Sequence, residues 1–236
     1  MSLEIKGLYK KFDEVSLYSD FNIGFPEGTI TCILGPSGCG KTTLLNIIGN
    51  IIKPDKGELL GFEGKAISYI FQDPRLLPWK TVKGNIGFVM SKDIPAAERQ
   101  KKVNQFIHLV ELDDFTGYYP SKLSGGMRQR VSIARAFAYP SDIILMDEPL
   151  KGLDIKLKLN LIKTFSQIWQ TDKRTVIFVT HDVDEALLLG DDIIVLSQAP
   201  VKISTRKKVE VPVTDRSLDS DYLKQLKRCL LEVLGN

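Results

Sequence analysis

The chain has 236 residues, of which 43% are hydrophobic and 26% charged, and its formal net charge is +3. The length suffices for one large domain or for a domain with an inserted lobe, and the composition is that of an ordinary soluble globular protein. So small a net charge gives no argument for nucleic acid as a partner.

The cysteines and the lengths of the apolar runs indicate the kind of cellular compartment in which the chain is expected. Cys32, Cys39 and Cys229 are isolated, without C-x-x-C spacing, which indicates a reducing compartment and not a disulfide framework. The first residues show no positively charged region followed by an apolar core, so no secretory signal is expected. No run approaches the ~18 apolar residues of a membrane span, and we expect the chain not to cross a bilayer.

The first quarter of the sequence predicts strands around one helix. Residues 3–8 alternate between apolar and polar side chains and residues 20–25 do so in part, which is typical of an antiparallel edge sheet. Residues 30–34 are a continuous apolar run that predicts a third strand, and apolar positions in residues 44–48 have helical spacing. Residues 57–64, after a turn with Pro and Gly, predict a short hairpin.

The pattern changes after a predicted strand at residues 66–71, which ends at Gln72. Prolines interrupt the next stretch, and residues 96–112 predict a helix with one apolar face: Val103, Phe106, Ile107 and Val110. We interpret residues 73–127 as a mainly helical lobe inserted into an α/β core made of residues 1–72 and 128–236.

The rest of the chain predicts more of that core. Residues 143–146 and 175–179 are near-continuous apolar runs, typical of strands buried on both faces of a parallel sheet. A covering helix between them is predicted from Leu153, Leu157, Leu161, Phe165 and Ile168. Residues 193–196 predict a further strand, and residues 217–234 an amphipathic helix. We assign its apolar stripe to core packing rather than to a partner surface: Leu218, Tyr222, Leu226, Cys229 and Val233.

The loop after the strand at residues 30–34 fits the phosphate-loop pattern G-x-x-x-x-G-K-[ST]. Its residues are Gly35, Pro36, Ser37, Gly38, Cys39, Gly40, Lys41, Thr42 and Thr43. The glycines permit a backbone whose N–H groups surround a phosphate, and the helix that follows adds its positive end. Lys41 has the position to reach the β- and γ-phosphates, and the Thr42 hydroxyl to hold Mg²⁺. Cys39 is interpreted as a small loop residue and not as a nucleophile.

Three of the predicted buried strands are followed by polar or loop residues. These are Gly35, Asp147 with Glu148, and Thr180 with His181. Ligands of parallel α/β sheets bind beyond the carboxyl ends of the strands. We therefore expect the phosphate loop, two carboxylates and a histidine to surround one bound phosphate chain.

Each of these side chains has a candidate role. Asp147 can hold Mg²⁺, and Glu148 can orient or deprotonate an attacking water, although a carboxylate at a helix start is the alternative for Glu148. Gln72 can ligate Mg²⁺ or position water through its amide oxygen. His181 can bond to a γ-phosphate, and packing beside the helix start at residues 182–185 is the alternative.

A second anion-binding device follows the helical lobe. Ser124, Gly125 and Gly126 open a helical run within the sequence Leu-Ser-Gly-Gly-Met-Arg-Gln-Arg, and a serine-capped helix N-terminus can bind an anion. Two such devices but one nucleotide-sized crevice indicate that the second device serves a neighbouring copy.

Together these motifs resemble the ATP-binding subunit of ABC transporters over essentially the whole chain. They stand in family order: the phosphate loop, Gln72, residues 123–130, residues 143–148, residues 149–154 and His181. The resemblance implies an α/β fold with a P-loop NTPase core, which is a mainly parallel sheet flanked by helices. It adds an N-terminal antiparallel β subdomain and an inserted helical subdomain.

The resemblance also implies a head-to-tail homodimer. Each ATP would lie between the phosphate loop of one copy and Ser124, Gly125 and Gly126 of the other. Phe12 matches the aromatic residue that stacks on adenine. Asp154, with Gly152 and Leu153, matches the segment that crosses the dimer interface, called the D-loop here. Leu150 and Lys151 depart from the phenylalanine and glycine that importers of this type usually have there.

Within the family, residues 72–79 resemble the importers of nitrate, sulfonates and taurine. Leu76, Leu77 and Trp79 make an apolar cluster in a proline-flanked loop, which favours docking to a membrane subunit. Packing against the helical lobe is the alternative for this cluster.

The implied function is ATP hydrolysis that drives import of a small solute. The implied partners are integral membrane permease subunits and, indirectly, a solute-binding protein, but no nucleic acid. The implied location is the cytoplasmic face of the cell membrane. An exporter or cell-division ATPase of the same fold shares every motif and stays an alternative. Non-transport relatives that act on DNA or ribosomes carry a long coiled coil or two cassettes, and this sequence has neither.

Overall fold

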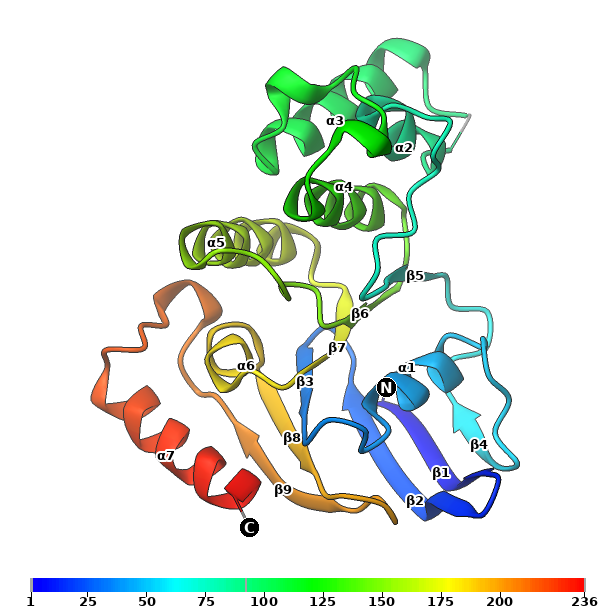
Figure 1. Cartoon of the computed structure of the whole chain (residues 1–236), viewed down its shortest axis with the longest axis vertical. Coiled ribbons are helices and arrows are strands. Elements are labelled where there is room, and N and C mark those ends of the chain that lie inside the picture. Colours follow the sequence, from blue (N-terminus) through cyan, green and yellow to red (C-terminus); the bar gives the residue numbers. More distant parts are fainter. Residues whose placement is uncertain (1, 92, 236) are drawn as a thin grey trace.

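The computed structural model describes residues 2–91 and 93–235 and contains two sheets, shown in Figure 1. The smaller sheet is antiparallel, with β1 at its centre, and fills the N-terminal part of the fold. Its strands in spatial order are β2 (Val15–Pro26), β1 (Ser2–Phe12) and β4 (Lys56–Leu60). The antiparallel edge sheet predicted from the alternation is therefore present, with strands longer than the alternating stretches.

The larger sheet has six strands, of which the first five run parallel. Their order is β5 (Ile67–Ile70), β6 (Ile143–Asp147), β7 (Thr175–Thr180), β3 (Ile30–Leu34), β8 (Asp192–Leu196) and β9 (Ile203–Lys208). Every residue of β3, β6, β7 and β8 is buried, as continuous apolar runs require of strands covered on both faces.

Alternate residues of these strands supply two hydrophobic cores. On one face, Ile33, Leu145 and Ile177 pack with the small sheet and with α1 (Lys41–Ile48). On the other face, Leu34 and Phe178 belong to a core covered by helices. Those helices are α4 (Gly125–Ala138), α5 (Ile155–Asp172), α6 (Val183–Leu189) and α7 (Asp221–Gly235).

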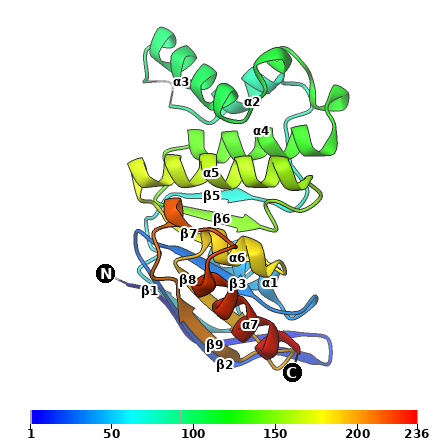
Figure 2. The same cartoon turned by 90° about the vertical axis from the view of Figure 1, so that its left-hand side faces the viewer.

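A helical lobe stands at one end of the molecule, away from β1, β2 and β9, in both views (Figures 1 and 2). It is formed by α2 (Val82–Phe88), α3 (Ala96–Leu109) and α4. The buried side chain of Asn85 holds the segment that leads into the lobe. It accepts a hydrogen bond from the N–H of Leu77 and donates to the carbonyls of Leu77, Lys80 and Thr81. Short 3₁₀ helices lie at Asp113–Phe115, Pro120–Lys122 and Val213–Asp215. The exact limits of the inserted lobe, residues 73–127, stay a prediction.

One expected strand pair is wrong, and one strand was not predicted. Residues 57–64 do not form a hairpin, because β4 pairs with β1 instead and the chain then turns away. β9 was not expected, since its sequence ISTRKK is polar and largely exposed. It is held by antiparallel pairing to the edge of β8.

The C-terminal helix differs in its start and in its buried face. It begins at Asp221 and not at residue 217, and its buried side chains are Leu223 and Leu230. Tyr222, assigned to the apolar stripe, is 37% exposed, whereas Leu226 and Val233 do pack against the core. The expected helix over residues 96–112 also ends earlier, at Leu109. Among the helices of residues 2–91 and 93–235, none has the length and hydropathy to span a membrane.

Candidate functional site

The loop between β3 and α1 is a tight turn packed against neighbouring strands. A Cβ atom on Gly35 would lie 2.8 Å from the Cys39 sulfur and 3.0 Å from the carbonyl oxygen of Leu196, so only glycine fits there. Cys39 is fully buried, and burial raises the pKa of its thiol, in line with its interpretation as a packing residue. Tyr18 donates a hydrogen bond of 3.1 Å to the carbonyl of Gly40 and fixes the end of the loop.

Lys41 is only 6% exposed, and its ammonium lies inside this loop. It donates hydrogen bonds to the carbonyl oxygens of Gly35, at 2.7 Å, and Pro36, at 2.9 Å. Gly40 caps α1 without a side chain, so the N–H groups of the first helical turn have no capping oxygen. The loop therefore presents backbone donors and one cation to the same point, as a phosphate group requires.

A hydrogen bond joins the loop to the end of β6. The Thr42 hydroxyl donates to Asp147 Oδ1 at 3.1 Å, although 105 residues separate the two in sequence. Asp147 is buried, and burial raises the pKa of its carboxyl group while the bond from Thr42 opposes the shift. These adjacent hydroxyl and carboxylate oxygens are donors of the kind that Mg²⁺ prefers.

Glu148 follows in an uncommon backbone conformation, with φ at 44°, and its N–H donates to the carbonyl of Val179 at 3.0 Å. Its Oε1 accepts a hydrogen bond from Nδ1 of His181 at 3.0 Å, and its Oε2 lies 2.6 Å from the ammonium of Lys151. Burial alone would raise the pKa of this carboxyl group, but Lys151 and His181 stabilise the carboxylate and hold the pKa below its usual value.

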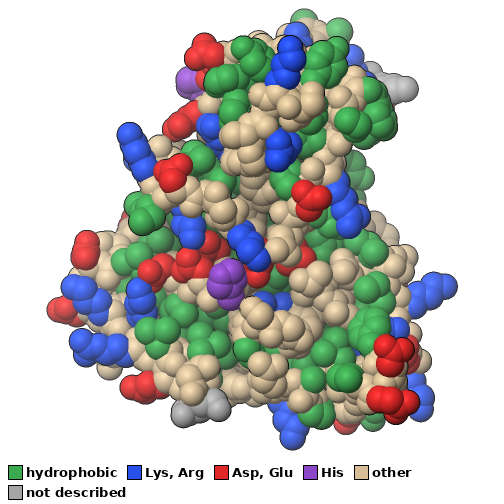
Figure 3. Space-filling view, in the orientation of Figure 1, with side chains coloured by type: hydrophobic (Ala, Val, Ile, Leu, Met, Phe, Trp, Pro, Cys, Tyr) green, Lys and Arg blue, Asp and Glu red, His purple; other side chains and the backbone are tan. Residues whose placement is uncertain are grey.

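The helix that follows His181 is held by a partly buried ionic group. Asp182 caps α6 by accepting from the backbone N–H of Asp184, and Thr180 donates to Glu185 at 2.7 Å. Lys158 of α5 reaches both carboxylates, at 2.8 Å from Asp182 and 2.7 Å from Glu185. Figure 3 shows acidic, basic and histidine side chains gathered where the upper lobe meets the lower body on this face.

Gln72 follows a strand of the larger sheet, and Phe12 ends a strand of the smaller sheet. β5 pairs in parallel with β6, with Ile70 beside Met146, so exposed Gln72 follows at the same sheet edge as Asp147. Phe12 ends β1 with its ring 44% exposed, and the ammonium of Lys10 lies 5.3 Å from the ring centroid.

The serine and two glycines of the second anion-binding device open α4. Ser124 caps the helix by accepting from the N–H of Met127 at 3.2 Å, and its neighbour Gly125 is exposed. Gly126 lies against Leu153, because a Cβ on this glycine would come within 3.2 Å of the leucine side chain. Asp154, also exposed, caps α5.

The expected residues thus fall into two groups. The phosphate loop, Asp147, Glu148 and His181 are gathered at the carboxyl ends of neighbouring strands. In the part of the chain that the structure describes, no hydrogen bond joins Ser124, Gly125 or Gly126 to that loop. Within the described residues, the Ser124 helix N-terminus is therefore not part of the hydrogen-bonded set around the phosphate loop.

The ion pairs of two lysines were not predicted from the sequence. Lys151 stands three residues after Glu148, a spacing that could have indicated an ion pair across the turn. Lys158 meets carboxylates 24 and 27 residues away, and no local pattern announces such a contact.

Fold and site together define a P-loop NTPase: a parallel sheet, a phosphate loop between β3 and α1, and carboxylates at the end of β6. Comparison with known proteins narrows this class. The family described as "ABC transporter" matches residues 18–151, which is more than half of the chain. The chain belongs to the ABC transporter family, as its ATP-binding, ATP-hydrolysing subunit.

Curated relatives cover nearly the full length. An uncharacterized ABC transporter ATP-binding protein of Methanocaldococcus jannaschii is 38% identical, over 98% of this chain and 90% of its own. A taurine import ATP-binding protein of Roseobacter denitrificans is 37% identical, over 96% and 88%. An aliphatic sulfonates import ATP-binding protein of Bacillus cereus is 36% identical, over 98% and 95%.

Solved structures agree with the fold. The dimeric structure of a bacterial ABC transporter cassette matches with a TM-score of 0.78 and 31% identity, over 89% of this chain and all of that one. A dimeric post-hydrolysis ATP-binding cassette with ADP and Pi matches with a TM-score of 0.77, also at 31% identity and the same coverage. These matches confirm the α/β P-loop NTPase fold with antiparallel and helical additions.

Proposed function

We propose that two copies of this chain, arranged head to tail, hydrolyse Mg-ATP between them and thereby drive import of a small solute of the nitrate, sulfonate and taurine group. The observation that carries the proposal is the division of the site within one copy. Among the described residues, no hydrogen bond joins the set around Lys41 and Glu148 to Ser124, Gly125 or Gly126 at the start of α4. The names of the relatives, taurine and aliphatic sulfonates import ATP-binding proteins, support the solute group.

The residues present fit Mg²⁺. Thr42 and Asp147 already place two oxygen atoms 3.1 Å apart, and Gln72 lies at the same edge of the sheet with an amide oxygen. We assign these three side chains as its protein ligands, partly through water. When bound, the ion neutralises charge on the β- and γ-phosphates.

The hydrolytic step needs a base close to the γ-phosphate. Glu148 has that place, and its lowered pKa keeps the carboxylate ionised and able to accept a proton from water at neutral pH. His181 orients the carboxylate through Nδ1 and offers Nε2 to the γ-phosphate, as a donor when the ring is protonated. Lys41 and the N–H groups of the loop hold the phosphates in place.

The partner copy completes the site in this proposal. Its Ser124, Gly125 and Gly126 contact the γ-phosphate through the start of α4, and its Asp154 lies at the crossing D-loop. Phe12 stacks on the adenine, for which its exposed ring is suited. ATP then joins the copies because both hold one γ-phosphate, and hydrolysis removes that shared ligand.

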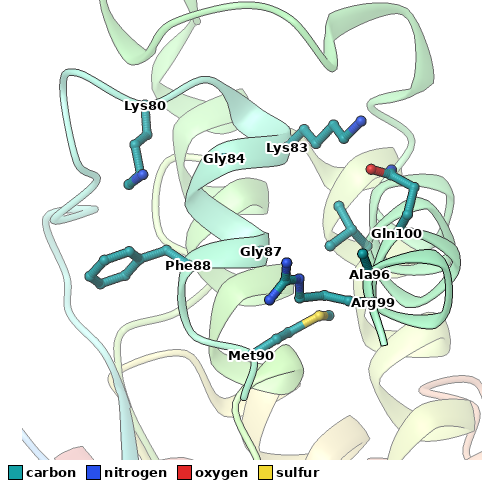
Figure 4. A pocket seen from close by; sticks show the side chains of 10 residues that line it. Lys80, Lys83, Gly84, Gly87, Phe88, Met90, Ala96, Arg99 and Gln100 are labelled. Atoms are coloured by element: carbon teal, nitrogen blue, oxygen red, sulfur yellow. The ribbon is translucent and has the colours of Figure 1, made fainter. Parts of the chain in front are cut away.

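The helical lobe offers a surface for the permease. Trp79 is 69% exposed and Phe88 62%, whereas Leu76 packs against the core and Leu77 is half-buried, so the expected apolar cluster is divided. Figure 4 shows the groove beside α2, with Lys80 and Phe88 on one side and Lys83, Arg99 and Gln100 on the other. We propose that a membrane subunit docks here, which places the chain at the cytoplasmic face of the membrane.

The test is reconstitution in liposomes with the membrane subunits and solute-binding protein that co-purify with this chain. We expect ATP-dependent uptake of a labelled sulfonate, taurine or nitrate, and loss of both uptake and permease co-purification with W79A/F88A. Uptake of none of the three solutes would contradict the solute group. ATP-dependent release of a solute would instead favour the exporter alternative.

A further inference from the structure

The turn that follows β6 is anchored in the core and carries one outward lysine. Leu150 is 4% exposed and packs with Ile133 and Phe165 under α5. The backbone N–H of Lys151 donates to the carbonyl of Glu148 at 3.2 Å, which closes the turn. Gln129 of α4 donates to the carbonyl of Pro149 at 2.8 Å and fixes the turn from below. The start of the Lys151 side chain therefore has a fixed place above Glu148.

This turn brings a cation onto the carboxylate that we assign as the base. The ammonium of Lys151 lies 2.6 Å from Glu148 Oε2, and His181 occupies Oε1 at 3.0 Å. The Glu148 side chain is 15% exposed, while those of Lys151 and His181 are 50% and 52% exposed. Both oxygens of the carboxylate are thus engaged, and Lys151 covers it from the solvent side.

We propose that Lys151 is a positioning residue that holds Glu148 in a resting arrangement and releases it when a second copy docks on the D-loop. The inference rests on the proposed role of Glu148 as the base. Glu148 Oε2 is buried in this arrangement, beside the Lys151 ammonium, so a water reaches that oxygen only after Lys151 moves aside. Lys151 is the partner suited to leave, because its ammonium ends a flexible four-carbon stem and is half in solvent.

The D-loop links this release to dimer formation. Residues 152–154 continue directly from Lys151, and Leu153 also touches Gly126 at the start of α4. A second copy that docks on these residues displaces the half-exposed ammonium of Lys151 or pairs with it. The free energy lost with the ion pair is small, because an ion pair at the surface shifts an equilibrium by no more than about five-fold. The Glu148–Lys151 ion pair is therefore strong enough to favour the resting arrangement in a single copy, and weak enough to break when a second copy docks.

A different role for Lys151 predicts the opposite result. If the ammonium paired with an acidic group of the second copy, its removal would weaken dimer formation and slow ATP hydrolysis. If it only stabilised the fold, its removal would lower the melting temperature and leave the ATPase rate per folded molecule unchanged.

The experiment compares K151Q with two control variants. K151R keeps the cation, and K156Q removes an exposed lysine at the start of α5. We expect K151Q to raise the ATPase rate of the isolated subunit about two- to five-fold. K151R and K156Q should match the wild type. Melting temperatures measured on the same samples show whether each variant is folded.

Dimer formation gives a readout independent of turnover. With a non-hydrolysable ATP analogue and Mg²⁺, light scattering should show a dimer dissociation constant for K151Q about two- to five-fold lower than for wild type. The same substitution in an E148Q background should change that constant little, because the carboxylate charge that Lys151 holds is already gone.

The outcomes separate this inference from the function on which it rests. An E148Q variant as active as wild type would overturn the role of Glu148, and the inference with it. If E148Q is inactive but K151Q is no faster than wild type, the resting arrangement is refuted and the proposed function stands. An equal effect of K151Q on dimer formation in both backgrounds also overturns the inference.

Discussion

The backbone sets the position of Glu148, and neighbouring side chains set the pKa of its carboxyl group. Its left-handed backbone conformation, with φ at 44°, turns the chain sharply at the end of β6, and the bond from its N–H to Val179 ties that turn to β7. A non-glycine residue keeps such a conformation only where its surroundings enforce it, which is common at functional sites. The carboxylate then meets His181 and Lys151, which lower its pKa.

Replacing this carboxylate should separate binding from turnover. We expect E148Q to bind ATP as tightly as wild type and to lose at least about 100-fold in ATPase rate, because an amide cannot accept the proton of water. The variant should also remain as an ATP-bound dimer in gel filtration, since the shared γ-phosphate is not removed. E232Q, an exposed glutamate of α7, is the control. A normal rate in E148Q would remove Glu148 from its assigned role.

Lys41 should act on affinity instead. Its ammonium is held by the Gly35 and Pro36 carbonyls, so it is preorganised beside the backbone donors of α1. A charge-assisted contact of this kind contributes about 1.5–3 kcal/mol, and we expect K41A to weaken ATP binding about 10- to 100-fold in calorimetry. K53A removes an exposed lysine beyond α1 and should leave affinity unchanged. Equal affinity in K41A and wild type would contradict the phosphate-loop assignment.

At the scale of elements, α5 and α6 are joined through one lysine. Lys158 reaches Asp182 at 2.8 Å and the buried carboxylate of Glu185 at 2.7 Å. Burial disfavours the charge of Lys158, but the two carboxylates outweigh it and raise the pKa. The same contacts, with backbone N–H groups of α6, lower the pKa of Asp182 against the effect of burial. This group fixes the helix that begins directly after His181.

Removing the lysine should cost stability over a defined pH range. We expect K158M to lower the free energy of unfolding by about 1–3 kcal/mol, or roughly 2–4 °C of melting temperature per kcal/mol. K156M on the same helix is the exposed control and should change little. The measurement is thermal unfolding of the three proteins side by side.

The sign of the pH dependence follows from the two shifts. Asp182 has a lowered pKa, so its contribution is present above its ordinary value of 3.8 and is lost as the pH falls through the lowered one. Lys158 has a raised pKa, so its contribution is present below 10.5 and is lost as the pH rises through the raised one. The gap between wild type and K158M should therefore be widest between about pH 4 and pH 10. A gap that stays the same at pH 3 would contradict this explanation.

The start of β4 offers a test of backbone packing. Gly57 has a φ of 108°, and a Cβ there would lie 2.6 Å from the carbonyl oxygen of Gly7 in β1. Gly64 also has a positive φ, 72°, but open space around it. We expect G64A to cost about 1–2 kcal/mol from backbone strain alone. G57A should cost at least about 2 kcal/mol more, because the two strands must move apart. Similar melting temperatures for both variants would show that this clash is relieved cheaply.

A structural feature could be predicted from the sequence where neighbouring residues determine it. The buried strands β3, β6 and β7 are near-continuous apolar runs, and the phosphate loop has fixed spacing, so both could be predicted. β9 has no such signal, because its exposed residues are held by pairing to β8 and not by burial. The bond between Thr42 and Asp147 follows from the parallel order of strands, whereas the bridge from Lys158 to Glu185 depends on how α5 lies over α6.

At the scale of the whole molecule, the two elements that we propose to bind ATP phosphates belong to different parts of one chain. The phosphate loop follows β3 of the sheet, whereas Ser124 caps α4, which lies between the lobe and the sheet in Figure 2. Gly126 of α4 lies against Leu153 of the D-loop. A twofold pair that brings the two elements together necessarily makes the site twice. Activity should then belong to pairs of chains and fall on dilution.

Two inactive variants should restore activity when mixed. S124E puts a charge where the partner's γ-phosphate is proposed to bind and should abolish turnover through repulsion, while E148Q lacks the base. A mixed pair has two different sites. In one site an intact Glu148 faces an intact Ser124, and this site should hydrolyse ATP. The other site carries both substitutions and should not hold ATP between the copies. Equal mixing before ATP is added should give at most about one quarter of wild-type activity, since random pairing makes half of the pairs mixed, each has one working site, and trapped E148Q pairs lower that share.

The control for this experiment is mixing S124E with K41A/S124E, because neither chain then offers an intact Ser124 to the other. This mixture should stay inactive at every ratio. Recovery in the first mixture and none in the second would support a site completed by the second copy. If S124E alone hydrolyses ATP at the wild-type rate and that rate per molecule is unaffected by dilution, each copy works by itself and the head-to-tail arrangement is wrong.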